Sequence, residues 1–131
     1  MTADTAAVFT DLAIAEMIAS GTTSLSDMYF FSDVIASRVA AAGIKANISR
    51  AITSFEEDYD LDSDRRAKEL FQLVEDWHGF DNGRICIEAA IHAEYTSHPK
   101  VWVALSEYAA KQGMRMQVHL SETKSEHEKM C

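Results

Sequence analysis

Helix-like segments and short apolar runs alternate along the whole chain, and this alternation limits the folds that the chain can adopt. Residues 4–20 carry apolar side chains at spacings of three and four and end before Gly21, a pattern that predicts a helix. Residues 22–31, TTSLSDMYFF, are rich in β-branched and aromatic residues and predict a strand. The same order repeats, with helices expected at 32–43, 65–77 and 99–113, strands at 44–48, 84–91 and 114–120, and a short C-terminal helix capped by Ser121.

Four strands that alternate with helices are typical of parallel β-α units joined by right-handed crossovers, so the sequence predicts the α/β class. A doubly wound sheet and part of a (β/α)8 barrel both have this order of elements. No glycine-rich turn follows a strand, which removes the usual evidence for nucleotide binding by a Rossmann or P-loop mechanism. The length suits one domain, and we expect a single domain over residues 1–131.

The chain carries 12 Lys and Arg against 21 Asp and Glu, a formal net charge of −9. A field of this sign repels phosphate backbones and anionic lipids, so we expect no nucleic-acid or membrane partner. Asp4 and Asp11 interrupt the N-terminal segment, and no run of 18 apolar residues is present, so neither a signal peptide nor a membrane span is expected. We therefore expect a cytoplasmic protein in which Cys86 and Cys131 stay reduced and have no special role.

Polar residues at the carboxyl ends of the predicted strands are the candidates for chemistry, because catalytic and binding groups of parallel β-α folds gather there. Asp27, Arg50, His92 and the pair His119 and Glu122 hold these positions, and Asp27 is expected to orient a loop by hydrogen bonding. A neutral imidazole at a strand end can bind a divalent metal, and a carboxylate three residues later can take a proton from the metal's water. Histidines with purely structural hydrogen bonds are the alternative, but the position of this pair directly after a buried strand favours a functional role.

Three motifs, taken together and in this order, extend the interpretation. They are G21-T-T-S-L-S-D-M-Y-F-F, H92-A-E-Y-T-S and V118-H-L-S-E-T. Their sequence and spacing resemble the cytosine-deaminase-like branch of the amidohydrolase superfamily, and within it the methylthioadenosine/S-adenosylhomocysteine deaminase and chlorohydrolase group. The resemblance runs from Asp4 to the C-terminal tail.

The resemblance implies a (β/α)8 barrel, of which this chain would supply the second to fifth strands, with one Zn²⁺ or Fe²⁺. The residue matching His119 is a metal ligand in that family, and the residue matching Glu122 is the proton shuttle. The family also implies substrate binding by His92, and it places Arg50 and Arg66 near positions that bind a substrate carboxylate. An ordinary surface ion pair is the alternative role for Arg66. The implied parent reaction is hydrolytic deamination of an aminopurine in a nucleoside-like small molecule, or a related C–Cl hydrolysis.

Two departures from the family pattern set further expectations. The H-x-H pair of the first barrel strand and the later His and Asp ligands are absent, so we expect this chain alone to be inactive and to bind metal weakly at most. Glu94 stands where the family usually has Pro, which adds a negative charge beside His92. A non-catalytic half-barrel that serves as an assembly or interaction module is the alternative function.

A half-barrel leaves the edge strands at 22–31 and 114–120 unpaired, and we expect its inner face to expose Val, Ile and Met side chains. These features predict a homo-oligomer. Two copies could close a barrel-like dimer, or the sheet could rearrange into a doubly wound form. A monomer whose terminal helices hide the edges is the alternative.

Overall fold

The computed structural model describes residues 1–130, in which short strands alternate with helices. The elements in chain order are α1 (Ala3–Ala19), β1 (Ser24–Met28), α2 (Ser32–Ala42), β2 (Lys45–Ile52), α3 (Arg65–Trp77), α4 (Phe80–Gly83), β3 (Ile85–Ala93), the 3-10 turn η1 (Glu94–Thr96), α5 (Pro99–Gln112), β4 (Met116–His119) and α6 (Lys124–Met130). The predicted α/β class is confirmed. Cys131 lies outside the described residues.

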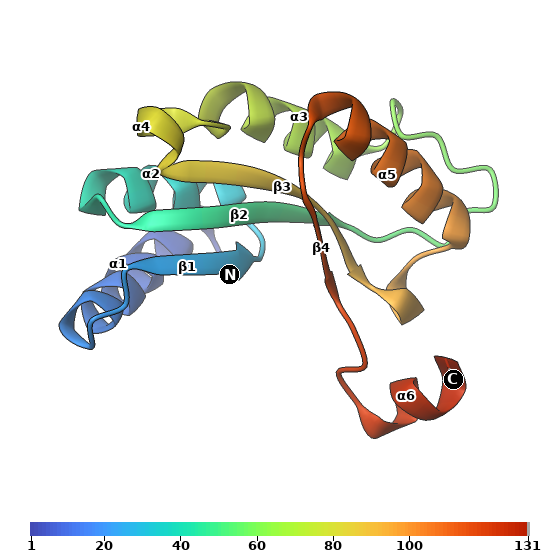
Figure 1. The fold of residues 1–131 in the computed structure, drawn as a ribbon, viewed down its shortest axis with the longest axis horizontal. Coiled ribbons are helices and arrows are strands. Elements are labelled where there is room, and N and C mark those ends of the chain that lie inside the picture. The colour runs from blue at the N-terminus through green and yellow to red at the C-terminus, as the bar shows by residue number, and fades with distance from the viewer. Residues whose placement is uncertain (131) are drawn as a thin grey trace.

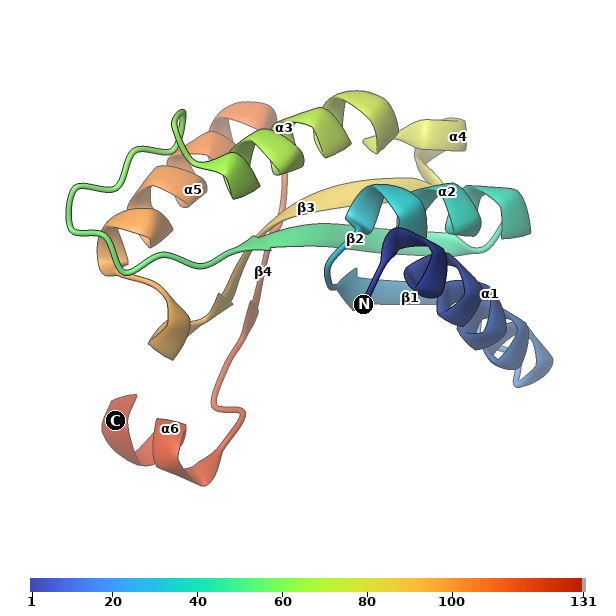
Figure 2. The ribbon, with the colours of Figure 1, turned by 180° about the vertical axis from the view of Figure 1, so that it is seen from behind.

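The four strands form one parallel sheet in the order β1-β2-β3-β4. Consecutive order means that every crossover moves in the same direction, and right-handed crossovers then bring the helices to the same face of the sheet. Figures 1 and 2 show α1, α2, α3 and α5 following the outer side of a curled sheet, while α6 lies apart beyond the end of β4. The sheet is therefore a half-barrel rather than a doubly wound sheet, because the latter reverses its strand order at a switch point.

The two faces of the sheet differ in chemistry. Side chains on the outer face pack under the helices and form the hydrophobic core, which includes the fully buried Ile48, Ile52, Ile85 and Leu105. Successive side chains of a strand point to opposite faces of the sheet, so the other half of the strand residues lies on the inner face.

The inner face is polar, so the expected row of Val, Ile and Met side chains is wrong. The Ser49 hydroxyl lies 2.7 Å from the Gln117 Oε1 atom, and the Gln117 amide donates to the Ser26 hydroxyl at 2.8 Å. Arg115 of the loop before β4 likewise pairs with Glu88 of β3 at 3.1 Å. Because the Gln117 contact joins β4 to β1 across two intervening strands, it is possible only in a strongly curled sheet.

Several boundaries differ from the sequence-based expectation. β2 extends to Ile52 and β3 to Ala93, so Arg50 and His92 lie within strands and not after them. β1 is shorter than expected, since it ends at Met28, and Phe31 turns the chain into α2 with a φ of 59°. Ser121 does not cap the last helix: Thr123 does, because its hydroxyl accepts from the Glu126 N–H at 3.1 Å.

Candidate active site

A cluster of four side chains lies where β3 and β4 end, and we call it the rim cluster: His92, Tyr95, His119 and Glu122. The His92 and His119 ring centroids are 5.1 Å apart with the rings nearly perpendicular. The Tyr95 hydroxyl donates to the Glu122 carboxylate at 3.2 Å, and the His92 and Tyr95 ring centroids are 6.3 Å apart. The structure thus brings together three residues that the sequence predicted, and adds Tyr95.

Local backbone geometry explains why these side chains converge. The β3–β4 register shifts between Ala90 and Ala93, which sets Ala93 opposite His119 and puts His92 beside it. The Thr96 hydroxyl accepts from the Ala93 N–H at 2.9 Å and closes the turn η1 that carries Tyr95.

On the other side of the cluster, the Glu126 carboxylate accepts from the Glu122 and Thr123 N–H groups at 3.0 and 3.2 Å. Together with the Thr123 cap, this contact fixes the segment that bears Glu122.

Three buried polar atoms in or near the rim cluster have no hydrogen-bond partner within the described part of the chain: Nδ1 of His92, Oε2 of Glu94 and Oε1 of Glu126. Most buried polar atoms in proteins are paired, so unpaired ones beside a cluster of titratable groups are candidates for ligand contacts. The hydrogen bond to Glu122 raises the pKa of Tyr95, which keeps its hydroxyl protonated as a donor. Glu94, which departs from the family pattern, lies near His92. It adds a carboxylate oxygen there that accepts no hydrogen bond from the described residues.

Two of the described side chains lie at a spacing that suits metal ligands. Two imidazoles on one tetrahedral ion, with metal–nitrogen distances of about 2.0–2.1 Å, have ring centroids about 5 Å apart, and the His92–His119 pair fits this spacing. No group of three or more His, Cys, Asp or Glu side chains among the described residues is placed to hold a metal ion. The chain thus offers two imidazoles, fewer than the three protein ligands of a catalytic zinc site.

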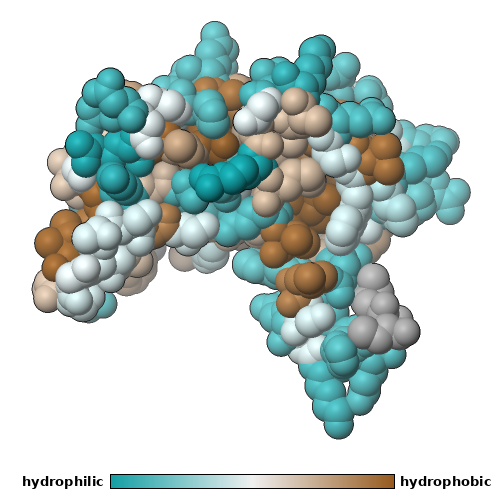
Figure 3. All heavy atoms as spheres, viewed as in Figure 1, coloured by the Kyte–Doolittle hydropathy of each residue, from teal (hydrophilic) through white to brown (hydrophobic). Residues whose placement is uncertain are grey.

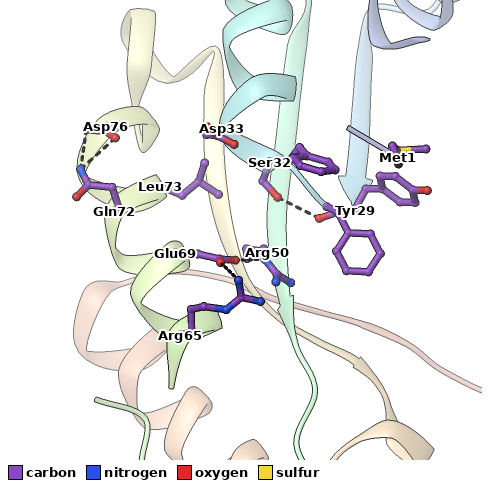
Figure 4. Close-up of a pocket in the computed structure, with 12 residues that line it drawn as sticks. Met1, Tyr29, Ser32, Asp33, Arg50, Arg65, Glu69, Gln72, Leu73 and Asp76 are labelled. Atoms are coloured by element: carbon purple, nitrogen blue, oxygen red, sulfur yellow. Dashed lines mark hydrogen bonds and ion pairs between the residues drawn. The ribbon is translucent and has the colours of Figure 1, made fainter. Parts of the chain in front are cut away.

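Arg50 lies on the other face of the sheet from the histidines. It pairs in register with Ala89 of the buried core, and its guanidinium binds the Glu69 carboxylate of α3 at 2.7 Å and stacks 5.6 Å from the Phe30 ring centroid. Arg65 also reaches Glu69, at 3.6 Å. These side chains line a cavity of about 770 Å³ between the start of α2 and one side of α3 (Figure 4).

Arg66 lies in a different polar pocket, of about 440 Å³, beside the acidic loop at 54–64. Its guanidinium pairs with Asp64 at 2.8 Å and reaches the Thr53 hydroxyl at 3.3 Å. Burial alone would raise the pKa of Asp64, but the hydrogen bonds and charge of Arg66 outweigh it and hold that pKa below its usual value. Arg66 thus already has the ion-pair partner that the ordinary surface role requires.

Asp27 does not play the part expected of it. Its Oδ1 atom is buried and has no hydrogen-bond partner among the described residues, so this oxygen orients no loop. In the strand register Asp27 lies opposite Ile48 of the hydrophobic core, and desolvation by burial raises the pKa of its carboxyl. No local sequence pattern indicates this, because the face of the sheet on which Asp27 lies depends on how β1 pairs with β2.

Comparison with known proteins agrees with these observations. The model of the amidohydrolase family matches residues 1–130. This chain belongs to the amidohydrolase family. The family expectation drawn from the three motifs is therefore confirmed.

Among similar curated proteins, the 5-methylthioadenosine/S-adenosylhomocysteine deaminase of Moorella thermoacetica is 35% identical over 117 residues, which are 89% of this chain and 26% of that protein. The 5'-deoxyadenosine deaminase of Methanosphaera stadtmanae is 31% identical over 118 residues, 88% of this chain and 27% of that protein. The chain thus spans about a quarter of the length of these relatives.

Two solved structures illustrate the likeness in fold. An adenosine deaminase from Xanthomonas campestris with bound zinc matches 98% of this chain and 29% of its own, with a TM-score of 0.84 and 28% identity. The zinc complex of atrazine chlorohydrolase from Arthrobacter aurescens matches 93% of this chain and 31% of its own, with a TM-score of 0.78; at 18% identity it supports the fold alone.

Proposed function

We propose that this segment belongs to a barrel that hydrolytically deaminates an aminopurine in a nucleoside-like substrate related to S-adenosylhomocysteine or methylthioadenosine. The observation that carries the proposal is the rim cluster, in which the His119 imidazole, the His92 imidazole and a carboxylate held by Tyr95 lie side by side. The names of the similar deaminases support the substrate class. Hydrolysis of a C–Cl bond is the related alternative, because it needs the same attack on a ring carbon with a different leaving group.

The rim residues have distinct roles in this proposal. A divalent metal held in part by His119 would supply activation of water near neutral pH. Glu122 accepts a proton from the attacking water and returns it to the departing amine, which leaves as ammonia. Tyr95 donates to Glu122 and holds its carboxylate toward the rim. The buried Nδ1 atom of His92 gains a hydrogen-bond partner when substrate binds.

We also propose that Arg50 and Arg66 help to bind a carboxylate on the substrate. Both guanidiniums already pair with protein carboxylates, Glu69 and Asp64, so a substrate carboxylate has to share or displace these partners. Arg50 lines a cavity on the face of the sheet opposite to His92, so a substrate that contacts both residues has to extend around the carboxyl end of β2. Substitution of Arg50 should therefore lower kcat/KM less for substrates without a carboxylate than for S-adenosylhomocysteine.

A chimera tests this function, because the chain spans about a quarter of its relatives. Residues 1–130 replace the matching segment of the Moorella deaminase, and the chimera is incubated with S-adenosylhomocysteine, methylthioadenosine, guanine and a chlorotriazine. We expect ammonia release from an adenine nucleoside, and a loss of about 10²–10⁴-fold in kcat for Glu122→Gln.

Glu128→Gln is the matched control for this chimera and should keep the activity, since Glu128 is exposed on α6 and pairs there with Lys124. A folded, metal-loaded chimera that turns over none of the four substrates contradicts the proposal.

A non-catalytic role of the isolated chain is the second candidate. It is favoured by the finding that the described residues place no three ligands around a common point. We expect the isolated chain to deaminate nothing and to hold metal weakly. Mass spectrometry of the native protein measures the metal content, and tight stoichiometric zinc together with purine deamination would refute this candidate.

The described residues contain no helix long and apolar enough to cross a membrane. Cys86 is a free cysteine, which is usual in reducing compartments. We infer a cytoplasmic location, with no nucleic-acid partner because of the net charge of −9.

A further inference from the structure

Glu122 lies on a segment of the chain that belongs to neither of the adjoining elements. β4 ends at His119, α6 begins at Lys124, and Ser121 between them has a φ of 51°. Glu122 itself is exposed. An exposed glutamate on an irregular segment samples many conformations, and fixing it in one of them costs conformational entropy. A group outside β4 therefore has to hold Glu122 if its carboxylate is to keep one place in the rim cluster.

The carboxylate of Glu126 holds the backbone of Glu122. Its Oε2 atom accepts the Glu122 N–H at 3.0 Å and the Thr123 N–H at 3.2 Å, while the Thr123 hydroxyl accepts the Glu126 N–H at 3.1 Å. The two bonds between Thr123 and Glu126 are those of an ordinary capping box. The bond to Glu122 reaches one residue further, to the residue whose carboxylate accepts from Tyr95.

The burial of Glu126 is more than a short helix needs. Glu126 is 4% exposed and is the one buried residue in the segment 121–128. Figure 3 shows a mostly hydrophilic surface over the visible face of α6, so the helix does not bury this residue as part of an apolar stripe. Its Oε1 atom is buried without a hydrogen-bond partner among the described residues, which costs stability. Costly local arrangements of this kind are expected at functional sites.

Two elements thus hold the two ends of Glu122. Tyr95 of η1 donates to its carboxylate at 3.2 Å, and Glu126 of α6 accepts from its backbone. The hydrogen bond to Glu122 is the main cause that raises the pKa of the Tyr95 hydroxyl, and the charge of Glu126 adds to it. The Glu126 carboxylate therefore lies close enough to the rim cluster to act on it.

We propose that Glu126 is a positioning residue for the proposed reaction, and that it acts by holding the Glu122 backbone so that the Glu122 carboxylate stays in the rim cluster. This role rests on the proposed function, in which Glu122 moves a proton between the attacking water and the departing amine. Glu126 touches no reacting atom in this proposal, so its loss should slow the reaction and leave substrate binding almost unchanged.

The chimera with the Moorella deaminase tests this role. Glu126→Ala removes the acceptor of both N–H groups, and we expect kcat to fall about 10–100-fold with little change in KM. Glu126→Gln should restore most of kcat. The reason is that a single oxygen, Oε2, accepts both hydrogen bonds, and the amide oxygen of Gln can replace it.

Ser125→Gly is the matched control for the stability of α6. Ser125 is exposed in this helix, and Gly at this position weakens the helix without removing the Glu126 carboxylate. A residue that only stabilised α6 would give the same loss of kcat in both variants. We expect Ser125→Gly to keep its kcat.

A second measurement needs no activity. Three-bond NMR coupling constants of Glu122 in the 131-residue chain show whether its χ1 angle keeps one staggered rotamer or averages over several. We expect one rotamer in the unsubstituted chain, in Ser125→Gly and in Glu126→Gln. In Glu126→Ala we expect averaging, because the backbone that carries the side chain is no longer held.

A Glu126→Ala chimera that keeps its kcat, an equal loss in Ser125→Gly, or Glu122 rotamers that are the same with and without the Glu126 carboxylate would overturn the proposal. A chimera that is inactive before any substitution contradicts the proposed hydrolysis instead, and the rotamers of Glu122 then decide whether Glu126 positions it.

Discussion

At the scale of single residues, the face of the sheet on which a strand residue lies decides which other side chains it can contact. Arg50 and His92 each looked like a residue at a strand end, but both lie inside strands. The pairing of Arg50 with Ala89 sends its guanidinium to the helix-covered face, whereas His92 meets His119. A one-residue change in parity moves a side chain to the opposite face, which is why strand ends assigned from sequence are weak evidence for a shared site.

Asp27 leads to a prediction about stability. Burial raises the pKa of its carboxyl, so the folded state holds this proton more tightly than the unfolded state does. The carboxylate therefore costs stability as pH rises above the ordinary Asp pKa of about 3.9, and costs nothing well below it. Asp27→Asn should raise the melting temperature by a few degrees at pH 7, and the gain should shrink toward pH 3.

Thermal unfolding followed by circular dichroism between pH 3 and pH 8 measures this effect. Asp33→Asn is the control, because Asp33 is exposed in the first turn of α2, where a negative charge is favourable. An unchanged melting temperature of the Asp27 variant at pH 7 would show that the buried carboxylate carries no cost.

At the scale of elements, the start of α3 depends on one carboxylate. Asp64 accepts from the Arg66 and Ala67 N–H groups and pairs with the Arg66 guanidinium. Its depressed pKa means that this stabilisation is present above the unfolded pKa of about 3.9 and is lost as pH falls through the lower folded value. We expect Asp64→Ala to cost about 1–2 kcal/mol of unfolding free energy at pH 7, and little at pH 2.

Urea unfolding at the two pH values measures this loss. Asp64→Asn keeps a capping acceptor but removes the charge, so it should fall between the wild type and the Ala variant. A cost for Asp64→Ala that is the same at pH 7 and pH 2 would assign the stabilisation to something other than the ionised cap.

The last helix is held by a reciprocal cap. Thr123 accepts from the Glu126 N–H, while the Glu126 carboxylate accepts from Glu122 and Thr123. Glu126→Ala should destabilise α6 by about 1 kcal/mol and speed the hydrogen exchange of the Glu122 and Thr123 amides about fivefold. Glu128→Ala leaves the cap intact and should not change their exchange. Equal exchange in both variants would mean that the carboxylate does not hold Glu122 in place.

At the scale of the whole molecule, charge opposes the association of two copies. Each chain has a formal net charge of −9, so two copies repel each other in solution at low salt. Raising the ionic strength from about 0.01 M to about 0.1 M shortens the Debye length from about 30 Å to about 10 Å. For the homo-oligomer that the sequence predicts, the dissociation constant Kd should therefore fall at least severalfold over this range. Sedimentation equilibrium gives the Kd, and an association that weakens with salt would mean that attractive ion pairs dominate the contact between the copies.

The sequence by itself determined the order of the elements, the parallel α/β class and the family. These follow from local signals: the switch between helical and strand periodicity, glycines that end helices, and three motifs whose order and spacing are specific. It also indicated that His92 and His119, which end apolar runs, and Glu122, three residues after His119, would meet at one edge of the sheet, as they do.

Only the tertiary structure decided how these residues face one another. The register shift in β3 brings the His92 ring centroid to 5.1 Å from that of His119. Tyr95 donates to Glu122 from the turn η1, whereas Arg50 binds Glu69 of α3. The polar inner face could not be predicted from the sequence either. Its hydrogen-bonded residues, Ser26, Ser49 and Gln117, are far apart in the chain and meet only when the sheet curls. Contacts between strands depend on register and curvature, and both are set by long-range packing that no local pattern encodes.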